Sequence, residues 1–389
     1  VLLRHRAAVC WPHDPVQALA DLGDCARRGE GAGEGALLRA YLERQAGTLR
    51  PGPLPQDPGA ARQVRLVHAL AALDRSEFEP YREAMNAVFE DQGLLGPIPR
   101  DAARFDFARL DGHPEAERRH DGPLVSVIMT AFNAAATVGY AARSVLAQTH
   151  ANLELLVVDD LSADDTPRLL AGLAAADPRL RVLRGEANVG TYLAKNRAME
   201  QARGAFVTFH DADDWAHPER LARHVALMQG TPRLVASRSE WLRVEEGGEV
   251  SFHRWNHRFQ HLNPASMFLR REAVEQAGFF DGVRFGADTE YWHRLRRVFG
   301  APRLETLRLC LGLGAAHDAS LTRSGPGAMG LEKYSPLRGA YAAAFTAWHA
   351  AASPEELRQP AAPSRRPFPV PPEMLAQAAE PGPPSSSVS

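Results

Sequence analysis

The chain has 389 residues, 45% of them hydrophobic, which is enough for two domains with buried cores. Its formal net charge of −2 excludes the global basic field of a typical nucleic-acid-binding protein. The three cysteines, Cys10, Cys25 and Cys310, have no Cys-x-x-Cys spacing, which argues against a disulfide framework or a structural zinc site and fits a reducing compartment.

Residues 1–121 are predicted to form a helical N-terminal region. Apolar residues recur there at three- and four-residue spacing in four segments, which is typical of amphipathic helices. Segments rich in glycine or proline, 29–35 and 51–55, interrupt the pattern. The predicted helices cover 16–28, 36–45, 61–73 and 77–89. No residue of this region indicates a catalytic or binding role.

From Pro123 the pattern changes to short apolar runs that alternate with helical segments. Strands that alternate with helices predict right-handed βαβ units and a parallel sheet, and nearly continuous apolar runs indicate strands covered on both faces. The predicted strands are 124–129, 153–158, 180–183 and 205–209, and the predicted helices are 135–147, 165–175, 192–203 and 218–229. Residues 122–325 are therefore predicted to form an α/β, Rossmann-like domain with a mostly parallel sheet flanked by helices.

After Thr231 the periodicity loosens. Segments 240–244 and 250–253 flank a Glu/Gly-rich turn and are predicted to pair as a hairpin. A strand is predicted at 266–269, and helices are predicted at 271–277 and 289–299.

The chain is predicted to end in a helical extension, 326–352, and a tail. The helix of this extension, 337–352, has Arg338 as its only Lys or Arg, so packing on the domain or at a dimer contact is favoured over a membrane surface. Residues 353–389 are rich in proline and serine, which predicts a disordered tail.

An acidic loop follows the fourth predicted strand. Asp211, Asp213 and Asp214 lie in His-Asp-Ala-Asp-Asp-Trp, residues 210–215. Carboxylates held this close are costly unless a cation neutralises them, and ligands of open α/β sheets bind at the carboxyl ends of the strands. The loop therefore predicts a divalent metal that carries a phosphorylated ligand. The alternative is a solvated acidic turn.

Other polar residues are predicted to reach the same edge of the sheet. Thr130 and Asn133 follow the first strand, Asp159 and Asp160 end the second, and Asn188-Val-Gly190 precedes the third helix of the domain. Because parallel strands share a direction, these groups converge on one crevice. The set predicts a nucleotide-diphosphate site, although each aspartate alone could cap a helix.

The sequence resembles family 2 glycosyltransferases of the GT-A fold over roughly residues 123–324. The resemblance depends on the order and spacing of several motifs. These are Val125-Ser-Val-Ile-Met-Thr-Ala-Phe-Asn133, Ser144-Val-Leu-Ala-Gln-Thr149, Val157-Val-Asp-Asp-Leu-Ser162, Asn188-Val-Gly190, Asn196, and Asp211-Ala-Asp-Asp214 with Pro218-Glu-Arg-Leu221. It implies a nucleotide-sugar donor, Mn²⁺ or Mg²⁺, and inversion at the anomeric carbon.

The resemblance also implies roles for individual residues. Asp160 is expected on the base, Asp211 near the ribose or sugar, and Asp213 on the metal, with Asp211 and His317 as further metal ligands. The residues expected to contact the nucleotide sugar are Thr130, Ala131, Phe132, Asn133, Asp159, Asp160, Asn188, Gly190, Asn196, Asp211 and Ala212.

An inverting transfer needs a general base that takes the proton of the acceptor hydroxyl. Family 2 enzymes resembling this chain place it in an acidic segment that opens a helix, and Gly286-Ala-Asp-Thr-Glu-Tyr-Trp292 aligns with that segment. Asp288 is the expected base and Glu290 the reserve candidate. Ala287 stands where the family usually has Glu, which puts neighbouring acceptor or donor contacts in doubt. The alternative makes Asp288 an N-cap and Glu290 an early-turn carboxylate.

Histidines give weaker signals. His317 lies in a stretch resembling the one that closes many such domains, where the histidine binds the metal or diphosphate, and a structural role is the alternative. His253, His257 and His261 recur every four residues, but the interleaved aromatic residues favour an acceptor-side loop or hairpin over a metal site.

The predicted function is that of an inverting, metal-dependent, hexosyltransferase-like enzyme in bacterial surface polysaccharide or glycan synthesis. A UDP-sugar donor is favoured, and the acceptor is expected to be a carbohydrate or a lipid-linked glycan; no nucleic-acid partner is expected, and oligomerisation is left open. The sequence has no run of about 18 apolar residues, so no transmembrane segment is predicted. A cytoplasmic protein is expected, with peripheral binding to the inner face of the membrane as an alternative. The alternatives are a nucleotidyltransferase and a non-catalytic nucleotide-sugar-binding module.

Overall fold

The computed structural model describes residues 32–49, 52, 54–110, 112–253, 258–317, 335–362 and 366–376. The chain forms two compact units. The smaller unit contains Val1–His113 and Trp241–His261, and the larger contains Pro114–Glu240 and Leu262–Ser389. The helix predicted at 16–28 lies outside the described residues. No described helix is both long and apolar enough to cross a membrane.

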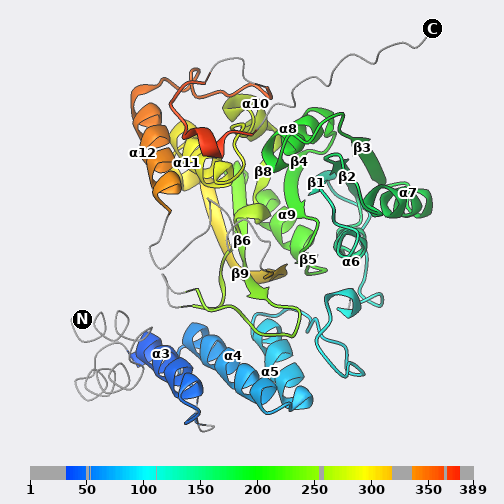
Figure 1. Cartoon of the computed structure of the whole chain (residues 1–389), viewed down its shortest axis with the longest axis vertical. Helices are drawn as coiled ribbons and strands as arrows, with labels where there is room; N and C mark the ends of the chain where they lie inside the picture. The colour runs from blue at the N-terminus through cyan, green and yellow to red at the C-terminus, as the bar shows by residue number, and fades with distance from the viewer. Residues whose placement is uncertain are drawn as a thin grey trace. The chain divides into compact units, whose positions relative to one another are not determined.

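The smaller unit contains three described α-helices, drawn in blue in Figure 1: α3 (Ala32–Gln45), α4 (Pro58–Asp74) and α5 (Phe78–Glu90). They confirm the helices predicted at 36–45, 61–73 and 77–89. Helix α4 begins where the Asp57 side chain accepts a hydrogen bond from Ala60 N at 2.7 Å, which satisfies one of the unpaired amides of its first turn. Proline at N1 adds a backbone angle suited to a helix start.

The segment Trp241–His261 is part of the smaller unit, although its sequence lies within the predicted α/β domain. Val244 pairs with Val250 in an antiparallel bridge, which confirms the predicted hairpin. The ring of Phe252 stacks on Tyr41 at 4.3 Å between centroids. At the turn, the Tyr81 hydroxyl donates a hydrogen bond to Gly248 O at 2.8 Å. Buried aromatic packing therefore ties the hairpin to the N-terminal helices.

The larger unit is built on one mixed sheet. Its strand order is β3-β2-β1-β4-β8-β6-β9-β5, with β7 paired to β6. Strands β1, β2, β3 and β4 pair in parallel, whereas β8 is antiparallel to β4 and β6. The strands are β1 (Val125–Ala131), β2 (Leu153–Asp159), β3 (Leu180–Arg184), β4 (Phe206–Asp211), β5 (Trp215–Ala216), β6 (Ala236–Val244), β7 (His261–Leu262), β8 (Phe268–Arg270) and β9 (Leu304–Ala315). The predicted α/β class and the parallel βαβ half are confirmed.

Helices cover both faces of this sheet (Figure 1). They are α6 (Val138–Leu146), α7 (Thr166–Ala176), α8 (Thr191–Gln201), α9 (Arg220–Gly230), α10 (Arg271–Ala277), α11 (Ala287–Phe299) and α12 (Pro336–Ala351). Short 3₁₀ turns are η1 (Phe107–Arg109), η2 (Pro264–Ser266), η3 (Ala301–Arg303) and η4 (Pro372–Met374). Each predicted helix of the domain has a counterpart among them.

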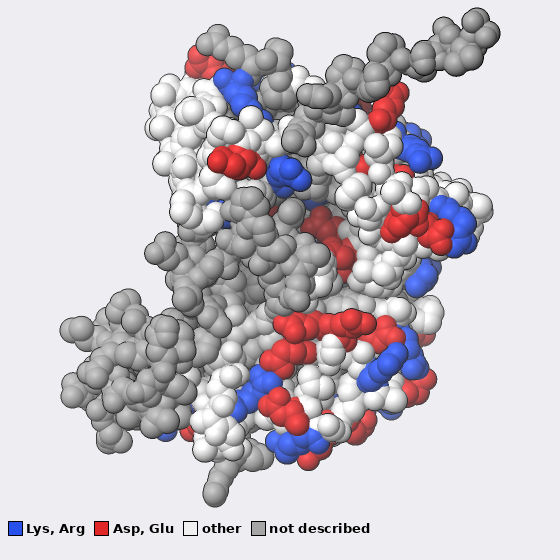
Figure 2. Space-filling view, in the orientation of Figure 1, with Lys and Arg blue, Asp and Glu red and all other residues white. Residues whose placement is uncertain are grey.

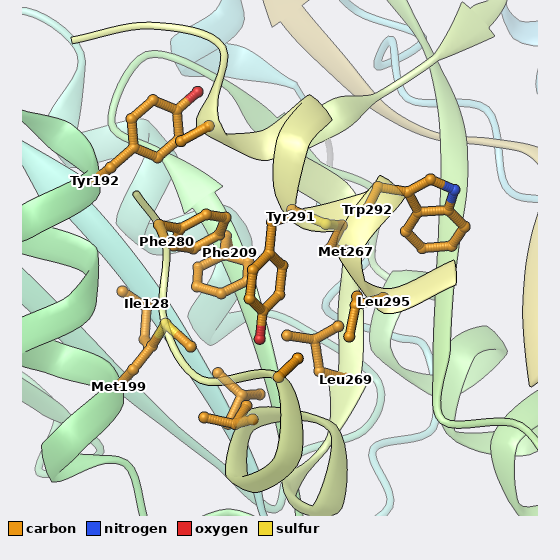
Figure 3. Packing of buried hydrophobic residues seen from close by; sticks show 14 of the residues in the cluster. Ile128, Tyr192, Met199, Phe209, Met267, Leu269, Phe280, Tyr291, Trp292 and Leu295 are labelled. Atoms are coloured by element: carbon orange, nitrogen blue, oxygen red, sulfur yellow. The ribbon is translucent and has the colours of Figure 1, made fainter. Parts of the chain in front are cut away.

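Two hydrophobic cores lie on the two faces of the sheet. One contains Val127, Val157 and Phe268 with residues of α6 and α9. The other contains Phe209 and Tyr291 with residues of α8, α11 and α12. In the second core Phe280 packs between Phe209 at 5.0 Å and Tyr192 at 5.3 Å (Figure 3). Helices α8 and α11 are thereby fixed against the end of β4, where the acidic loop begins.

The chain after Ser353 differs from the predicted disordered tail. Residues 353–362 and 366–376 have defined positions in the larger unit, whereas 377–389 lie outside the described residues. Phe368 and Met374 are buried in the core formed with α8 and α11. Composition predicted disorder because proline and serine dominate the segment, but a few apolar anchors are enough to fix it.

Candidate functional site

The carboxyl ends of β1, β2 and β4 lie side by side because these strands pair in parallel: Ala131 pairs with Asp159, and Thr130 pairs with both Val158 and Asp211. The register alone therefore brings the predicted polar groups to one edge of the sheet. Figure 2 shows acidic side chains recessed in the surface of this unit.

Asp160 shapes the turn that opens α8. It is buried, and its two carboxylate oxygens accept hydrogen bonds from Val189 N at 3.0 Å and Gly190 N at 2.8 Å. Gly190 has φ +83°, a conformation that favours glycine. Each oxygen keeps lone-pair capacity for a further donor. Asp160 can therefore hold the turn and still accept from a heterocycle N–H.

Two further predicted residues support the same edge. The Thr130 hydroxyl lies 2.8 Å from the hydroxyl of Thr191 on α8. Asp159 is 1% exposed and accepts from Ser162 N, while its second oxygen makes no hydrogen bond within the described chain and lies 3.8 Å from Arg184 Nε. Thr191 is a contact that sequence reasoning missed.

The loop after β1 is open to solvent. Asn133 has φ +49°, and its side-chain oxygen accepts from Ala163 N at 2.8 Å, so it links this loop to the one after β2. Phe132 is 53% exposed, and Asn188 is also exposed. Ala131 and Ala212 are buried, which leaves their backbone groups as the parts suited to ligand contact.

Asp211, at the end of β4, pairs with a cation. Lys195 Nζ on α8 lies 2.8 Å from Asp211 Oδ1, and the Lys195 side chain is largely buried. Burial alone would raise the pKa of Asp211, but the attraction of the Lys195 ammonium outweighs it and holds this pKa below its usual range. Asp211 is therefore a carboxylate with one oxygen already engaged. Lys195 was not among the predicted site residues.

Asp213 and His317 meet at this edge from distant parts of the sequence. His317 Nε2, just beyond β9, lies 2.9 Å from Asp213 Oδ2, and both side chains are partly exposed. Asp214 is buried instead and accepts from Ala315 N at 3.1 Å. The structure thus separates the partly exposed Asp213, which is accessible to a ligand, from Asp214, which ties the acidic loop to β9.

Side chains of α6 and of the residues just after it hydrogen-bond the backbone of the acidic loop and of the residues that follow it. The Tyr140 hydroxyl donates to Asp213 O at 2.7 Å, the Ser144 hydroxyl accepts from Ala216 N at 3.0 Å, and Gln148 Nε2 donates to His217 O at 2.7 Å. Tyr140 and Ser144 are four residues apart and share one face of α6, and Gln148 lies just beyond the C-terminal end of the helix. The Ser144–Thr149 motif found in the sequence is thus a brace for the loop.

A buried pair, Arg220 and His210, also holds the acidic loop. Arg220 Nη1 lies 3.0 Å from His210 Nδ1, and His210 Nε2 lies 3.2 Å from Asp214 O. Since arginine can only donate, His210 accepts at Nδ1 and donates from Nε2. Burial and the Arg220 charge lower the pKa of His210 to about 3. Burial lowers the pKa of Arg220 to about 10 despite the attraction of Asp214 and Asp211.

The side chains at this edge of the sheet fit a metal ion only if a bound diphosphate supplies some of the metal's ligands. The described residues hold no group of three His, Cys, Asp or Glu side chains placed for a metal. Asp213 and His317 offer two ligands 2.9 Å apart, whereas Asp211 Oδ1 is occupied by Lys195. Mg²⁺-type sites commonly combine one or two carboxylates with substrate phosphates. The arrangement fits a metal completed by a diphosphate.

Asp288 lies on the first turn of α11 and is partly exposed. Gly286, in the left-handed conformation, precedes the helix, so Asp288 is not its N-cap. Burial raises the pKa of the Tyr192 hydroxyl, on α8, well above its usual value, and the charges of Asp288 and Asp211 add to the increase. The candidate base and the acidic loop therefore both lie within electrostatic reach of Tyr192.

Two predicted site residues are placed elsewhere. Asn196 is fully buried, donates to Phe280 O and Ala361 O, and accepts from Phe280 N, so it has no surface for a nucleotide. Glu290 is also fully buried and forms a two-fold ion pair with Arg294. The internal partners of these two buried side chains argue against the predicted donor contact of Asn196 and against the predicted reserve-base role of Glu290.

Two of the three recurring histidines, His253 and His261, lie in the hairpin segment of the smaller unit. His261 Nε2 accepts from Trp241 Nε1 at 3.2 Å, and burial lowers the pKa of His261 to about 4. Its ring lies 4.7 Å from that of His253 between centroids. His257 lies outside the described residues. His261 therefore takes part in aromatic packing within the smaller unit.

Comparison of the sequence with known protein families gives one match. Residues 126–291 match the model described as glycosyl transferase family 2. We call this part of the chain, which is similar to that family, the family 2 domain. The matched residues contain the whole parallel half of the sheet, the acidic loop and Asp288. Together with the sheet order, the match confirms the predicted GT-A fold class of the family 2 domain.

Two bacterial proteins are similar in sequence to part of this chain. A UDP-Glc:alpha-D-GlcNAc-diphosphoundecaprenol beta-1,3-glucosyltransferase, WfgD of Escherichia coli, is 40% identical over 108 residues, 28% of this chain and 42% of WfgD. The succinoglycan biosynthesis protein ExoO of Rhizobium meliloti is 41% identical over 103 residues, 26% of this chain and 29% of ExoO. The chain thus spans less than half of either relative.

A solved structure resembles the chain more distantly. S. aureus TarS in complex with UDP-GlcNAc is 21% identical, with a TM-score of 0.43, covering 52% of this chain and 61% of TarS.

Proposed function

We propose that the protein is an inverting glycosyltransferase that moves a sugar from a nucleotide diphosphate to a hydroxyl acceptor. The observation that carries the proposal is the placement of Asp160, Asp211 and Asp213 at one sheet edge, with the partly exposed Asp288 on the first turn of α11. The names of WfgD and ExoO support a sugar donor and a role in polysaccharide synthesis. A UDP-sugar donor and a carbohydrate or lipid-linked glycan acceptor follow from the same support.

The donor would lie with its nucleoside toward β1 and β2. Asp160 has acceptor capacity for a heterocycle N–H, and the exposed Phe132 ring can cover the base. Asp159 Oδ2, which makes no hydrogen bond within the described chain, lies at the end of the neighbouring strand β2. Asp211, held as a carboxylate by Lys195, would face the ribose or the sugar.

Asp213 and His317 would hold Mn²⁺ or Mg²⁺ together with the donor diphosphate. When bound, the metal supplies positive charge that stabilises the leaving diphosphate. The protein's own contribution is to hold the acidic loop still: Tyr140 and His210 fix its backbone at Asp213 O and Asp214 O. A loop held in this way does not have to reorganise during the reaction.

Asp288 would act as the general base. It would accept the proton of the acceptor hydroxyl while that oxygen bonds to the anomeric carbon from the face opposite the diphosphate. The bond between the anomeric carbon and the diphosphate oxygen breaks, and the nucleoside diphosphate leaves with the electron pair. Thr289 N and Thr289 Oγ1 donate hydrogen bonds to Asp288 Oδ1.

The proposal is tested by separating donor binding from transfer. UDP-sugars and GDP-sugars are screened with and without Mn²⁺ for a rise in melting temperature, and nucleotide release is measured with glycan acceptors. Asp288→Asn should retain the donor-induced shift and lose about 100-fold to 10,000-fold in turnover, the range typical of removing a general base. A full-length protein with no shift for any donor, or an Asp288→Asn variant with normal turnover, would overturn it.

A further inference from the structure

The chain after α12 crosses the loop that precedes α11. We call residues 357–362 and 366–376 the strap, and Gly278–Gly286 the base loop because it leads into Asp288. At one end Phe279 N donates to Gln359 O at 3.0 Å. At the other end Arg284 N donates to Met374 O at 2.7 Å, and Ala376 N donates to Gly282 O at 3.3 Å. The strap therefore holds the base loop at both ends.

The closest approach is at Gly278. Its φ of +75° favours glycine, and a Cβ built there would lie 2.0 Å from Gln359 O. No other residue fits without moving the strap. The Tyr291 hydroxyl of α11 also donates to Gly278 O, at 2.9 Å. The start of the base loop is thus clamped between the strap and the helix that carries Asp288.

The middle of the base loop is held by a buried ion pair. Arg366 Nη1 on the strap lies 2.6 Å from Asp281 Oδ1, and the Asp281 side chain is 1% exposed. The Tyr341 hydroxyl of α12 donates to Asp281 Oδ2 at 3.0 Å. Arg366 Nη2 also donates to Gly282 O. One guanidinium therefore joins the carboxylate and the backbone of the same loop.

Asp281 depends on this cation. Burial raises the pKa of Asp281 even with Arg366 present, and the charge of Glu290 adds to the increase. Without Arg366 the buried carboxylate would have Tyr341 as its only hydrogen-bond partner in the described chain. An uncompensated buried charge is costly, so the loop would rearrange or Asp281 would take up a proton.

We propose that Arg366 is a positioning residue, which acts through Asp281 to hold the base loop, and with it Asp288, against the donor site. This inference depends on the proposed role of Asp288. Misplacing a catalytic group by about 1 Å can cost about 100-fold in rate. The predicted donor contacts lie on or just after β1, β2 and β4, or just before or within α8, so they are outside the base loop. Loss of Arg366 should therefore lower kcat while the KM for the donor stays within about twofold.

The test compares Arg366→Met, Arg366→Lys and the matched control Arg358→Met. Arg358 belongs to the strap too, but its side chain donates to Glu275 O on α10 and does not touch the base loop. We expect Arg366→Met to lower kcat at least tenfold, Arg366→Lys to recover part of the loss, and Arg358→Met to match the wild type. An Arg366→Met variant with wild-type kcat, or with kcat and donor KM worsened by a common factor, would overturn the inference.

Hydrogen–deuterium exchange without substrate gives a second readout. In Arg366→Met, amides of 279–289 should exchange faster, while those of β1 and β2 should not change. Equal exchange over 279–289 in variant and wild type would overturn the inference even if activity fell. A wild-type protein that transfers no sugar would overturn the proposed function instead, so the two failures are distinguishable.

Discussion

His210 makes the acidic loop sensitive to acid. Its Nδ1 accepts a hydrogen bond from Arg220, and its Nε2 donates to Asp214 O, so both nitrogens are engaged only in the neutral ring. A proton added at Nδ1 would face the guanidinium of Arg220. Burial and this charge together lower the pKa of His210 to about 3. The unfolded chain, in contrast, takes up the proton near the ordinary pKa of 6.5.

The magnitude follows from proton linkage. The stability that His210 contributes is fully present above pH 6.5 and is lost as the pH falls toward 3, because only the unfolded state binds the proton in that window. A pH of 5 lies 1.5 units below the pKa of 6.5 that His210 has in the unfolded chain. At about 1.36 kcal/mol per pH unit, protonation of the unfolded chain lowers the free energy of unfolding by about 2 kcal/mol. His224, whose pKa burial also lowers to about 3, adds a similar amount.

Urea unfolding at pH 7 and pH 5 measures the effect. Wild type should lose about 4 kcal/mol from the two histidines between these values, and His210→Gln should lose about 2 kcal/mol less because one titrating ring is gone. His120→Gln, at an exposed histidine, is the control and should behave like the wild type. If His210→Gln and wild type lose the same stability, the account of a buried neutral His210 is refuted.

Two other predictions concern the site and its support. Tyr140→Phe removes the hydrogen bond to Asp213 O, worth about 1 kcal/mol, so the donor KM in Mn²⁺ should rise about fivefold with little change in melting temperature; an unchanged KM would show that the loop does not need this brace. Asn196→Ala leaves Phe280 and Ala361 with unpaired buried backbone groups and should cost at least about 2 kcal/mol in urea unfolding, whereas unchanged stability combined with weaker donor binding would return Asn196 to the donor site.

The parallel half of the sheet could be predicted from the sequence because each of its strands is a short apolar run followed by a helix. Strand β9 could not, since its first half is partly exposed and only its second half is buried. The hairpin within Trp241–His261 was predicted, but not that it packs on the N-terminal helices. That packing depends on pairs such as Tyr41 with Phe252, which are about 200 residues apart in the chain.

The site was predictable in its location more than in its details. On α8, Thr191 and Lys195 are four residues apart and face Thr130 and Asp211, whereas Asn196 faces Phe280. One residue along a helix turns a side chain by about 100°, and a motif does not show which neighbour faces the ligand. The same geometry separates the partly exposed Asp288 from the buried Glu290.

The most direct test of the central claim is a side-by-side measurement of donor affinity and transfer rate for Asp288→Asn with Mn²⁺ present. Our account predicts an unchanged dissociation constant for the nucleotide sugar and a turnover at least about 100-fold lower, because Asp288 is needed for the proton of the acceptor and not for the donor. Normal turnover with intact donor binding would contradict it.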